Sequence, residues 1–362
     1  MKVRHLDYQP GGASRVVFSG NLAWFTGHAA PQFPTLAQQT AGVLRRYDEL
    51  FAQFGLKKEN ILYAICFLKN ADDEEDFKQE YFKWIAPGCD PAGFTVTGVP
   101  IQHSPVGDNV LIELQFIVAT EENAVIERYD AEGSGARMVK YDGMCYFTGH
   151  VCPRFATLPE QTAGVLRRYD ELFERFGLKK ENVVMQYGFV KDIDDGYDGM
   201  CAAFADYFGE NPPAGVVVEA RPNQATPFGD NLQIELALFV ATGEKGDVVR
   251  RDVVPGMARV VEYNGLAWFT GHSARPEFVG TLEQTKALCA RYDELFAQFG
   301  YRKENLVMMY GFMADIEEYK DFDAGKAGFE CPDAPAAGVL VQARPSGEGN
   351  RLELQYILAL DD

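Results

Sequence analysis

The sequence has no long apolar run. No stretch approaches the roughly 18 consecutive apolar residues that a membrane-spanning helix needs, and Met1–His5 lead into no apolar segment typical of a signal peptide. Positive charge is also scarce, because 34 Lys and Arg residues stand against 53 Asp and Glu residues and leave a net charge of −19. Such a chain lacks the basic surface that binds nucleic acids and anionic membranes. We therefore expect a cytoplasmic protein with no membrane and no nucleic acid among its partners. Its acidic residues are dispersed along the chain and indicate solubility rather than cation binding.

Cysteine is sparse and irregularly placed. The seven cysteines form no CxxC pair, and none recurs at one position of the repeat described below; they are Cys66, Cys89, Cys145, Cys152, Cys201, Cys289 and Cys331. A disulfide framework or a zinc site would need more regular spacing. The sequence also lacks a P-loop, a GxSxG elbow or a GxGxxG after a strand. We expect free thiols, no metal and no cofactor.

One tetrapeptide recurs three times at a domain-sized interval. Phe-Thr-Gly-His occupies Phe25–His28, Phe147–His150 and Phe269–His272, so its histidines are spaced by 150 − 28 = 122 and 272 − 150 = 122 residues. Arg-Tyr-Asp-Glu-Leu-Phe recurs with it, beginning at Arg46, Arg168 and Arg291. A period of about 120 residues is that of a whole domain rather than of a solenoid repeat. We predict three tandem domains over residues 1–124, 125–246 and 247–362, joined by short polar stretches and packed against one another.

Each unit shows the same order of elements. In the first unit we expect strands over 16–18, 22–25, 61–68, 94–99 and 110–118, one helix between Thr35 and Gly55, and a weaker helix over 77–84. Thr35 with Gln38, Thr157 with Glu160 and Thr281 with Gln284 have the capping-box spacing. The predicted order is ββαβαββ, an α+β sandwich with helices on one sheet face. The other face needs a cover, and the sibling units can supply it.

The residues around the tetrapeptide resemble a known family. Gly20–Pro31 is similar to the signature of the Rid (YjgF/RidA-like) family, a glycine-asparagine turn that leads to Ser-Gly-Gln-x-x-Pro, and Phe189–Asp192 is close to its Phe-x-Lys-Asp. The resemblance extends over the whole chain three times. It implies chorismate-mutase-like domains, which in this family form homotrimers with a small-molecule pocket at each subunit interface. Three such units in one chain imply a monomer that acts as a pseudo-threefold trimer with three non-identical pockets; its further assembly is left open.

The family's enamine/imine deaminases hold the substrate carboxylate with the arginine of a Pro-Ala-Arg motif. This sequence has glycine at that position in every unit, at Gly93, Gly215 and Gly338. The departure argues against the standard 2-aminoacrylate-type activity. The tyrosine that lines the family's pocket is also replaced, by Ala13, Gly135 and Met257.

An arginine two residues after that tyrosine position could supply the lost cation, because residues i and i+2 of a strand share a face. These candidates are Arg15, Arg137 and Arg259. A guanidinium suits a carboxylate because its planar fork donates two hydrogen bonds. The alternative is an interface arginine in a salt bridge within the chain.

The family resemblance also implies a catalytic glutamate that orients water. Its counterparts are Glu113, Glu235 and Glu353. A carboxylate in a closed pocket can have a raised pKa and act as a general base. The alternative is a glutamate paired with an arginine at an interface.

The tetrapeptide itself supplies further candidate pocket residues. His28, His150 and His272 stand where the family has glutamine, and they could bind ligand, serve structure or meet a metal, although their neighbours offer no second ligand at metal spacing. Thr26, Gly27, Thr148, Gly149, Thr270 and Gly271 would give the pockets a hydroxyl and a close backbone approach. Tyr187 and Tyr310 recur where unit one has Ile65, which indicates that the pockets differ.

Three functions remain open from the sequence. The resemblance favours a non-standard Rid-like deaminase or hydrolase acting on a small carboxylated or enamine/imine metabolite. The alternatives are a non-catalytic binding or sensor protein with the same pockets, and a protein-interaction scaffold with degenerate pockets. The charged residues retained in each unit argue against the scaffold.

Overall fold

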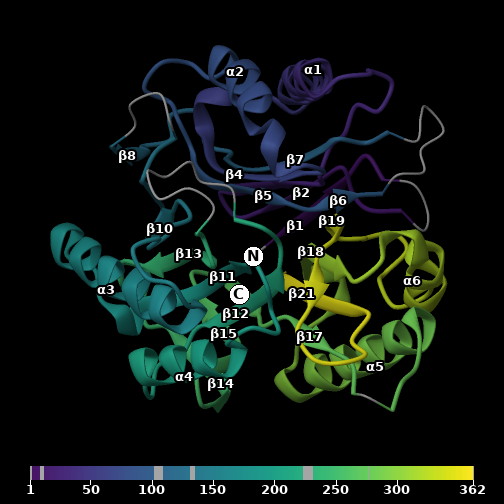
Figure 1. Ribbon diagram of the computed structural model, residues 1–362. Coiled ribbons are helices and arrows are strands. Elements are labelled where there is room, and N and C mark those ends of the chain that lie inside the picture. Colours follow the sequence, from purple (N-terminus) through teal and green to yellow (C-terminus); the bar gives the residue numbers. More distant parts are fainter. Residues whose placement is uncertain are drawn as a thin grey trace.

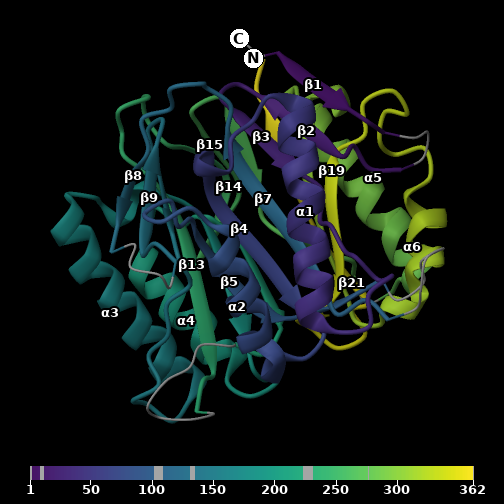
Figure 2. The same ribbon diagram turned by 90° about the horizontal axis from the view of Figure 1, so that it is seen from above.

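The computed structural model describes residues 2–8, 12–101, 109–130, 135–222, 231–275 and 277–361. Three mixed sheets lie around a common centre, and two helices cover the outer face of each sheet (Figure 1; Figure 2 shows the same arrangement from above). This confirms the predicted α+β class and the pseudo-threefold packing of three similar units. No helix of the described residues is both long and apolar enough to cross a membrane.

The three units repeat one series of elements. Unit one comprises β1 (Val3–Leu6), β2 (Val16–Ser19), β3 (Leu22–Phe25), α1 (Leu36–Phe54), β4 (Ile61–Leu68), α2 (Glu74–Trp84), β5 (Ala92–Thr97), β6 (Val99–Pro100) and β7 (Ile112–Ala119). Unit two comprises β8 (Glu127–Tyr129), β9 (Met138–Tyr141), β10 (Met144–Phe147), α3 (Leu158–Phe176), β11 (Val183–Val190), α4 (Tyr197–Phe208), β12 (Ala214–Glu219) and β13 (Ile234–Ala241). Unit three comprises β14 (Val249–Val254), β15 (Met257–Tyr263), β16 (Leu266–Phe269), β17 (His272–Ser273), α5 (Thr281–Phe299), β18 (Leu306–Met313), α6 (Tyr319–Lys326), β19 (Ala337–Gln342), β20 (Arg344–Pro345) and β21 (Leu352–Ala359). An edge strand that the sequence did not predict (β1, β8 or β14) precedes each hairpin.

Local sequence explains the ends of the long helices. The Thr157 side chain and the Glu160 side chain form the predicted capping box at the start of α3, and Thr35 caps α1 by accepting a hydrogen bond from the Gln38 backbone N–H at 3.3 Å. The prediction for α5 was wrong. Gly280, with φ of 83°, takes the cap position, and the Thr281 hydroxyl donates to Glu318 instead. Gly55, Gly177 and Gly300 end the three helices in the left-handed conformation that glycine adopts at low cost.

Short strands tie the units together in a cycle. β6 of unit one pairs with β19 of unit three, and β20 of unit three pairs with β12 of unit two. Unit two completes the cycle, because Pro222 forms a bridge with Val96 of β5. Each unit therefore completes the sheet of a neighbour, as in a trimer whose subunits exchange strand ends.

The inner faces of the three sheets share one apolar core. Trp24 and Trp268 meet edge to face with ring centroids 5.8 Å apart, and Phe67 lies 6.4 Å from Phe189 and 6.3 Å from Phe312. Three separate outer cores lie between each sheet and its helices. The central core supplies the cover that one sheet face of each unit requires.

A polar pair crosses two of the three unit boundaries inside this core. The Tyr187 hydroxyl donates to Gln355 Oε1 at 3.2 Å, and the Tyr310 hydroxyl donates to Gln115 Oε1 at the same distance. At the third boundary the equivalent positions hold Ile65 and Ala237, so tyrosine and glutamine have been replaced together. A lone tyrosine there would bury a hydroxyl without a partner.

Replacing Tyr187 with phenylalanine should destabilise the chain by about 1–3 kcal/mol, because Gln355 Oε1 would lose its donor in a dry core. Urea unfolding followed by circular dichroism measures the change. Tyr310→Phe should have a similar effect, since it breaks the sibling pair. Unchanged stability in both variants would contradict this view of the core.

Candidate functional site

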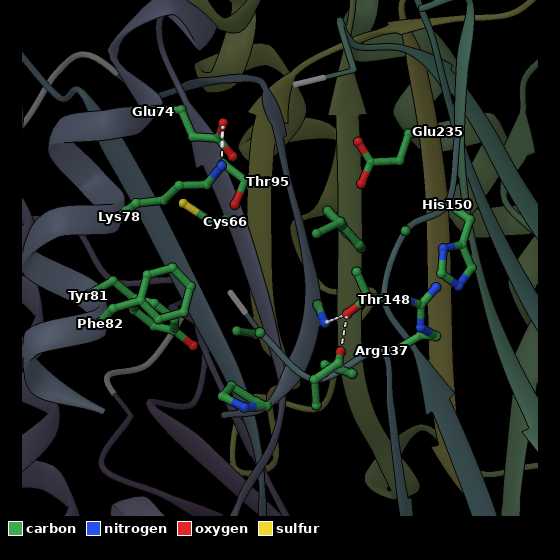
Figure 3. Close-up of a pocket in the computed structure, with 18 of the residues that line it drawn as sticks. Cys66, Glu74, Lys78, Tyr81, Phe82, Thr95, Arg137, Thr148, His150 and Glu235 are labelled. Atoms are coloured by element: carbon green, nitrogen blue, oxygen red, sulfur yellow. Dashed lines mark hydrogen bonds and ion pairs between the residues drawn. The ribbon is translucent and has the colours of Figure 1, made fainter. Parts of the chain in front are cut away.

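A cavity of about 420 Å³ lies between units one and two (Figure 3). Unit one contributes strand residues from β4 and β5 and side chains from α2, and unit two contributes the residues around its Phe-Thr-Gly-His tetrapeptide. The main lining residues are Ala64, Cys66, Glu74, Lys78, Tyr81, Phe82, Gly93, Thr95, Arg137, Thr148, His150, Arg168 and Glu235. We call the contact of units one and two junction 1, that of units two and three junction 2, and that of units three and one junction 3.

The threonine and glycine of each tetrapeptide clamp the neighbouring unit. At junction 1 the Gly93 N–H donates to Thr148 Oγ1 at 3.0 Å, and the Gly149 N–H donates back to the Gly93 carbonyl at 3.1 Å. Thr270 with Gly271 forms the same pair of bonds to Gly215, and Thr26 with Gly27 to Gly338. The threonine hydroxyls also donate to carbonyls of their own units, so they serve as structural clamps at all three junctions.

The packing of β4 against β5 leaves no room for an arginine at Gly93. A Cβ atom added to Gly93 would lie 2.1 Å from the backbone oxygen of Ala64. Real Cβ atoms do not approach a backbone oxygen so closely, so a side chain at this position would require the strands to shift. The anion-binding residue of the resembled family therefore cannot be restored here without moving β4 against β5.

The tetrapeptide glycine also makes room for the glutamate of the last strand. A Cβ atom added to Gly149 would lie 2.1 Å from Glu235 Oε1, and the equivalent distances are 2.0 Å for Gly27 to Glu113 and 2.1 Å for Gly271 to Glu353. Each carboxyl group thus rests against a glycine Cα. Glu235 and Glu353 are buried, and burial raises the pKa of Glu353 to about 8, opposed by a backbone hydrogen bond from Val217. Burial also raises the pKa of Glu113 to about 8.

Two arginines give the unit-two wall of the cavity its positive charge. Arg137 Nε donates to Asp130 at 2.7 Å, but Asp130 also accepts two hydrogen bonds from Arg175, so one carboxylate serves two guanidinium groups. Arg168, half-buried on α3, makes one long hydrogen bond of 3.5 Å to the Val151 carbonyl. Among the described residues it has no carboxylate within ion-pair distance. Burial, followed by the charge of Arg137, lowers the pKa of Arg168, which an incoming anion would relieve.

The sequence left two roles open for the repeated arginines, a cation in the pocket and a salt bridge within the chain, and the structure contains both arrangements. Arg15, Arg137 and Arg259 each pair with an aspartate of their own unit, at 2.8 Å for Arg15 to Asp7, while Arg137 also lines the cavity. Sequence reasoning missed Arg168 as a site residue. The sequence feature that could have identified it is the repeated Arg-Tyr-Asp-Glu-Leu-Phe, because its arginine directly precedes Tyr169. Tyr169 is buried on the helix face that packs on the sheet, so Arg168 lies at the edge of that face.

The histidines are buried and neutral. Each forms a backbone pair with the last long strand, as His150 does with Leu236, and its ring packs against the tyrosine of the long helix, with centroids 5.1 Å apart for His150 and Tyr169. Burial, helped by Arg168 and Arg137, lowers the pKa of His150 to about 3. His150 lines the cavity, and its Nε2 atom has no hydrogen-bond partner among the described residues. In the described part of the chain, no group of three or more His, Cys, Asp or Glu residues could hold a metal ion.

The unit-one wall mixes small, aromatic and paired charged residues. In Figure 3, Tyr81, Phe82 and the Glu74–Lys78 ion pair project from α2 across the cavity from Glu235, His150 and Arg137. Lys78 Nζ lies 2.8 Å from Glu74. Burial, followed by the charge of Glu74, raises the pKa of the Cys66 thiol, so this cysteine is a neutral group and not a ready nucleophile.

Tyr187 and Tyr310 lie away from this cavity. Both belong to the central core, with ring centroids 5.9 Å apart. Successive residues of a strand face opposite sides of the sheet, so Tyr187 points inward where its neighbours Gln186 and Gly188 face the helices and the junction.

Replacing Glu353 with glutamine should remove a pH-dependent loss of stability. Because the folded-state pKa is about 8 and the ordinary value is 4.5, unfolding releases a proton between these values, and the stability contributed by the protonated carboxyl falls as the pH rises through this window. The wild-type chain should lose roughly 2–4 kcal/mol more than Glu353→Gln between pH 5 and pH 8. Urea unfolding of both proteins at the two pH values measures this difference. Parallel pH profiles would contradict a buried, protonated Glu353.

Parts of the chain are similar to known proteins. Residues 125–241 match the family model described as Endoribonuclease L-PSP. A RutC family protein of Haemophilus ducreyi is 21% identical over 114 residues, which are 32% of this chain and 97% of that protein. Among solved structures, a chorismatase covers 83% of this chain and 93% of its own, with a TM-score of 0.54 and 13% identity. A YjgF-family protein of Neisseria meningitidis covers 32% of this chain and 97% of its own, with a TM-score of 0.31 and 21% identity. The chorismatase likeness shows that the fold of most of this chain is a known one.

Proposed function

We propose, from the premise that this chain belongs to the Rid/YjgF family and consists of three tandem Rid-like units, that it is a hydrolase-type enzyme. Its substrate would be a small carboxylated metabolite of the enamine or imine kind, and junction 1 would be its active site. The proposal rests on the charged and polar side chains that unit two contributes to the cavity wall. Two guanidinium groups with incomplete neutralisation face a cavity that also holds a buried carboxyl and an imidazole nitrogen without a partner among the described residues.

The substrate carboxylate would lie against Arg137 and Arg168. This position replaces the anion site that the resembled family builds at the position of Gly93, so the substrate would be held from unit two instead of unit one. Charge-assisted hydrogen bonds from a guanidinium fork are strong and directional, and they strengthen further in a cavity with little water.

Hydrolysis of an imine requires a water molecule to add to the C=N carbon and ammonia to leave, with a carbonyl as the product. Glu235 would take one proton from the attacking water and a second from the hydroxyl group of the resulting carbinolamine, and would pass both to the nitrogen, so that the C–N bond breaks with release of ammonia and the carbonyl forms. His150 Nε2, on a neutral imidazole, would hydrogen-bond the substrate or the water. The cavity wall of Cys66, Thr95 and the α2 aromatic residues would hold the rest of the substrate.

The proposal is tested with the purified full chain and a panel of carboxylates: freshly generated 2-iminopropanoate, pyruvate, benzoate and chorismate, the last because of the chorismatase likeness. Calorimetry reports binding, and coupled assays report ammonia or a carbonyl product. Product formed by the wild-type chain and not by an Arg137→Ala/Arg168→Ala variant supports the enzyme. Binding without product supports the sensor alternative. No binding of any acid would overturn both, and cleavage of RNA would favour the activity in the family model's description.

A further inference from the structure

The three junctions share their clamps and charged residues but differ in the strand wall that faces them. At one position of β4, β11 and β18, the third strand of the ββαβαββ series, the three units carry Ala64, Gln186 and Met309. These residues are equivalent because Ala64 pairs with Gly93, Gln186 with Gly215 and Met309 with Gly338 in the parallel strand pairs. The wall is therefore small at junction 1 and bulky at the other two.

At junction 2 the side chain of Gln186 occupies the space above the clamp glycine. A Cβ atom added to Gly215 would lie 2.8 Å from Gln186 Cγ and 2.9 Å from its Nε2. Gln186 is 5% exposed, and its Oε1 atom has no hydrogen-bond partner among the described residues. The carboxamide thus lies at the place where junction 1 has its cavity, which Ala64 and Gly93 both line.

At junction 3 the apolar side chain of Met309 lies beside the clamp glycine, and that of Leu340 lies over Gly311, where unit one has Cys66. A Cβ atom added to Gly338 would meet Met309 Cε at 3.4 Å, and one added to Gly311 would meet Leu340 Cδ1 at 2.5 Å. Met309 and Leu340 both belong to the apolar core of unit three. Leu340 stands at the position of Thr95 in unit one, so this wall is larger and less polar at two places.

The arginines of unit one show the consequence. Arg15 and Arg46, the counterparts of Arg137 and Arg168, line a hollow of about 470 Å³ whose lining residues all belong to unit one. At junction 1 the corresponding pair faces side chains of the neighbouring unit across a shared cavity. The arginine pair of unit two therefore lines a cavity shared with unit one, whereas the pair of unit one lines a hollow of its own unit.

We propose that the side chain at the position of Ala64, Gln186 and Met309 decides which junction admits a ligand, so that the chain binds one carboxylate, at junction 1, while Gln186 and Met309 fill junctions 2 and 3. The tetrapeptide persists at the filled junctions because its threonine and glycine clamp the neighbouring unit, while the glycine–glutamate contact and the histidine backbone pair stabilise the unit that contains them. The kind of ligand in this inference rests on the proposed function, whereas the space available at each junction does not.

Exchanging the wall residues tests the inference. Four proteins are compared: the wild type, Ala64→Gln, Gln186→Ala and the double exchange. Crystals of each are solved without ligand and after soaking in benzoate or pyruvate, and calorimetry counts the molecules bound. We expect the acid at junction 1 only in the wild type, no binding by Ala64→Gln, a second molecule at junction 2 in Gln186→Ala, and binding at junction 2 only in the double exchange. Gln186→Ser replaces Gln186→Ala if the latter fails to fold.

The outcomes separate this inference from the proposed function. An acid at junction 2 or 3 of the wild type, or unchanged binding by Ala64→Gln, would overturn the inference and leave the function standing. Ligand-free crystals decide the matter even if neither acid binds. If the cavity at junction 1 closes in Ala64→Gln and one opens at junction 2 in Gln186→Ala, the inference is supported even though the proposed function fails. If Val217 or the backbone fills junction 2 in Gln186→Ala, the inference is contradicted.

Discussion

Replacing Arg168 with methionine is expected to weaken carboxylate binding by roughly 30- to 1,000-fold. Arg168 has no carboxylate partner among the described residues, so its charge is available to an anion, and burial has already lowered its pKa. Loss of one member of a buried, hydrogen-bonded charge pair costs about 2–4 kcal/mol, which corresponds to that range of Kd. Methionine keeps an unbranched apolar stem against α3 while removing the charge. Calorimetric titration with the acid that binds the wild-type chain measures the effect.

The repeat supplies matched controls for Arg168. Arg46→Met and Arg291→Met remove the equivalent charge at junctions 3 and 2, where Met309 and Gln186 fill the strand wall. Both should leave the Kd within a few fold of the wild-type value, and all three variants should unfold at similar urea concentrations. Equal losses from the three substitutions would mean that the arginines act through the general charge of the chain and that junction 1 is not the binding site.

Much of the fold could be predicted because it rests on local and repeated features. The spacing of the tetrapeptide gave three units, and Thr157 with Glu160 marked the start of α3, because a capping box depends on residues within one turn. Thr281 had the same spacing and failed, since the loop before it places Gly280 at the cap and Glu318 within reach of the hydroxyl. The exchange of β6 and β20 between units had no local signal, because such pairing depends on how the sheets pack.

The candidate site was predicted in part. The tetrapeptide and the glutamates of the last strand were expected at an interface between units, and the structure brings His150, Thr148 and Glu235 to one cavity. The alternation of strand residues could have shown that Tyr187 faces away from Gln186. The room at junction 1 could not be predicted, because Ala64, Gln186 and Met309 all fit a buried strand, and only the packed structure shows which of them leaves a void.

Replacing Glu235 with glutamine should lower kcat by about 100- to 1,000-fold with little change in KM, if junction 1 hydrolyses its ligand. Glutamine keeps the shape that rests against Gly149 but cannot accept a proton from water. General base catalysis contributes an acceleration of about this size. Because the substrate carboxylate is held by Arg137 and Arg168, ground-state binding should survive, so the loss belongs to the chemical step. The rate of product formation over a range of substrate concentrations separates kcat from KM.

Glu113→Gln and Glu353→Gln distinguish catalysis from structure. All three glutamates rest on a tetrapeptide glycine, so a merely structural role would make the three substitutions equivalent in activity and in stability. A catalytic role confined to junction 1 requires that Glu235→Gln alone reduces kcat and flattens the pH-rate profile. Loss of activity in Glu353→Gln equal to that in Glu235→Gln would place chemistry at junction 2 as well, and would show that Gln186 yields to the substrate instead of excluding it.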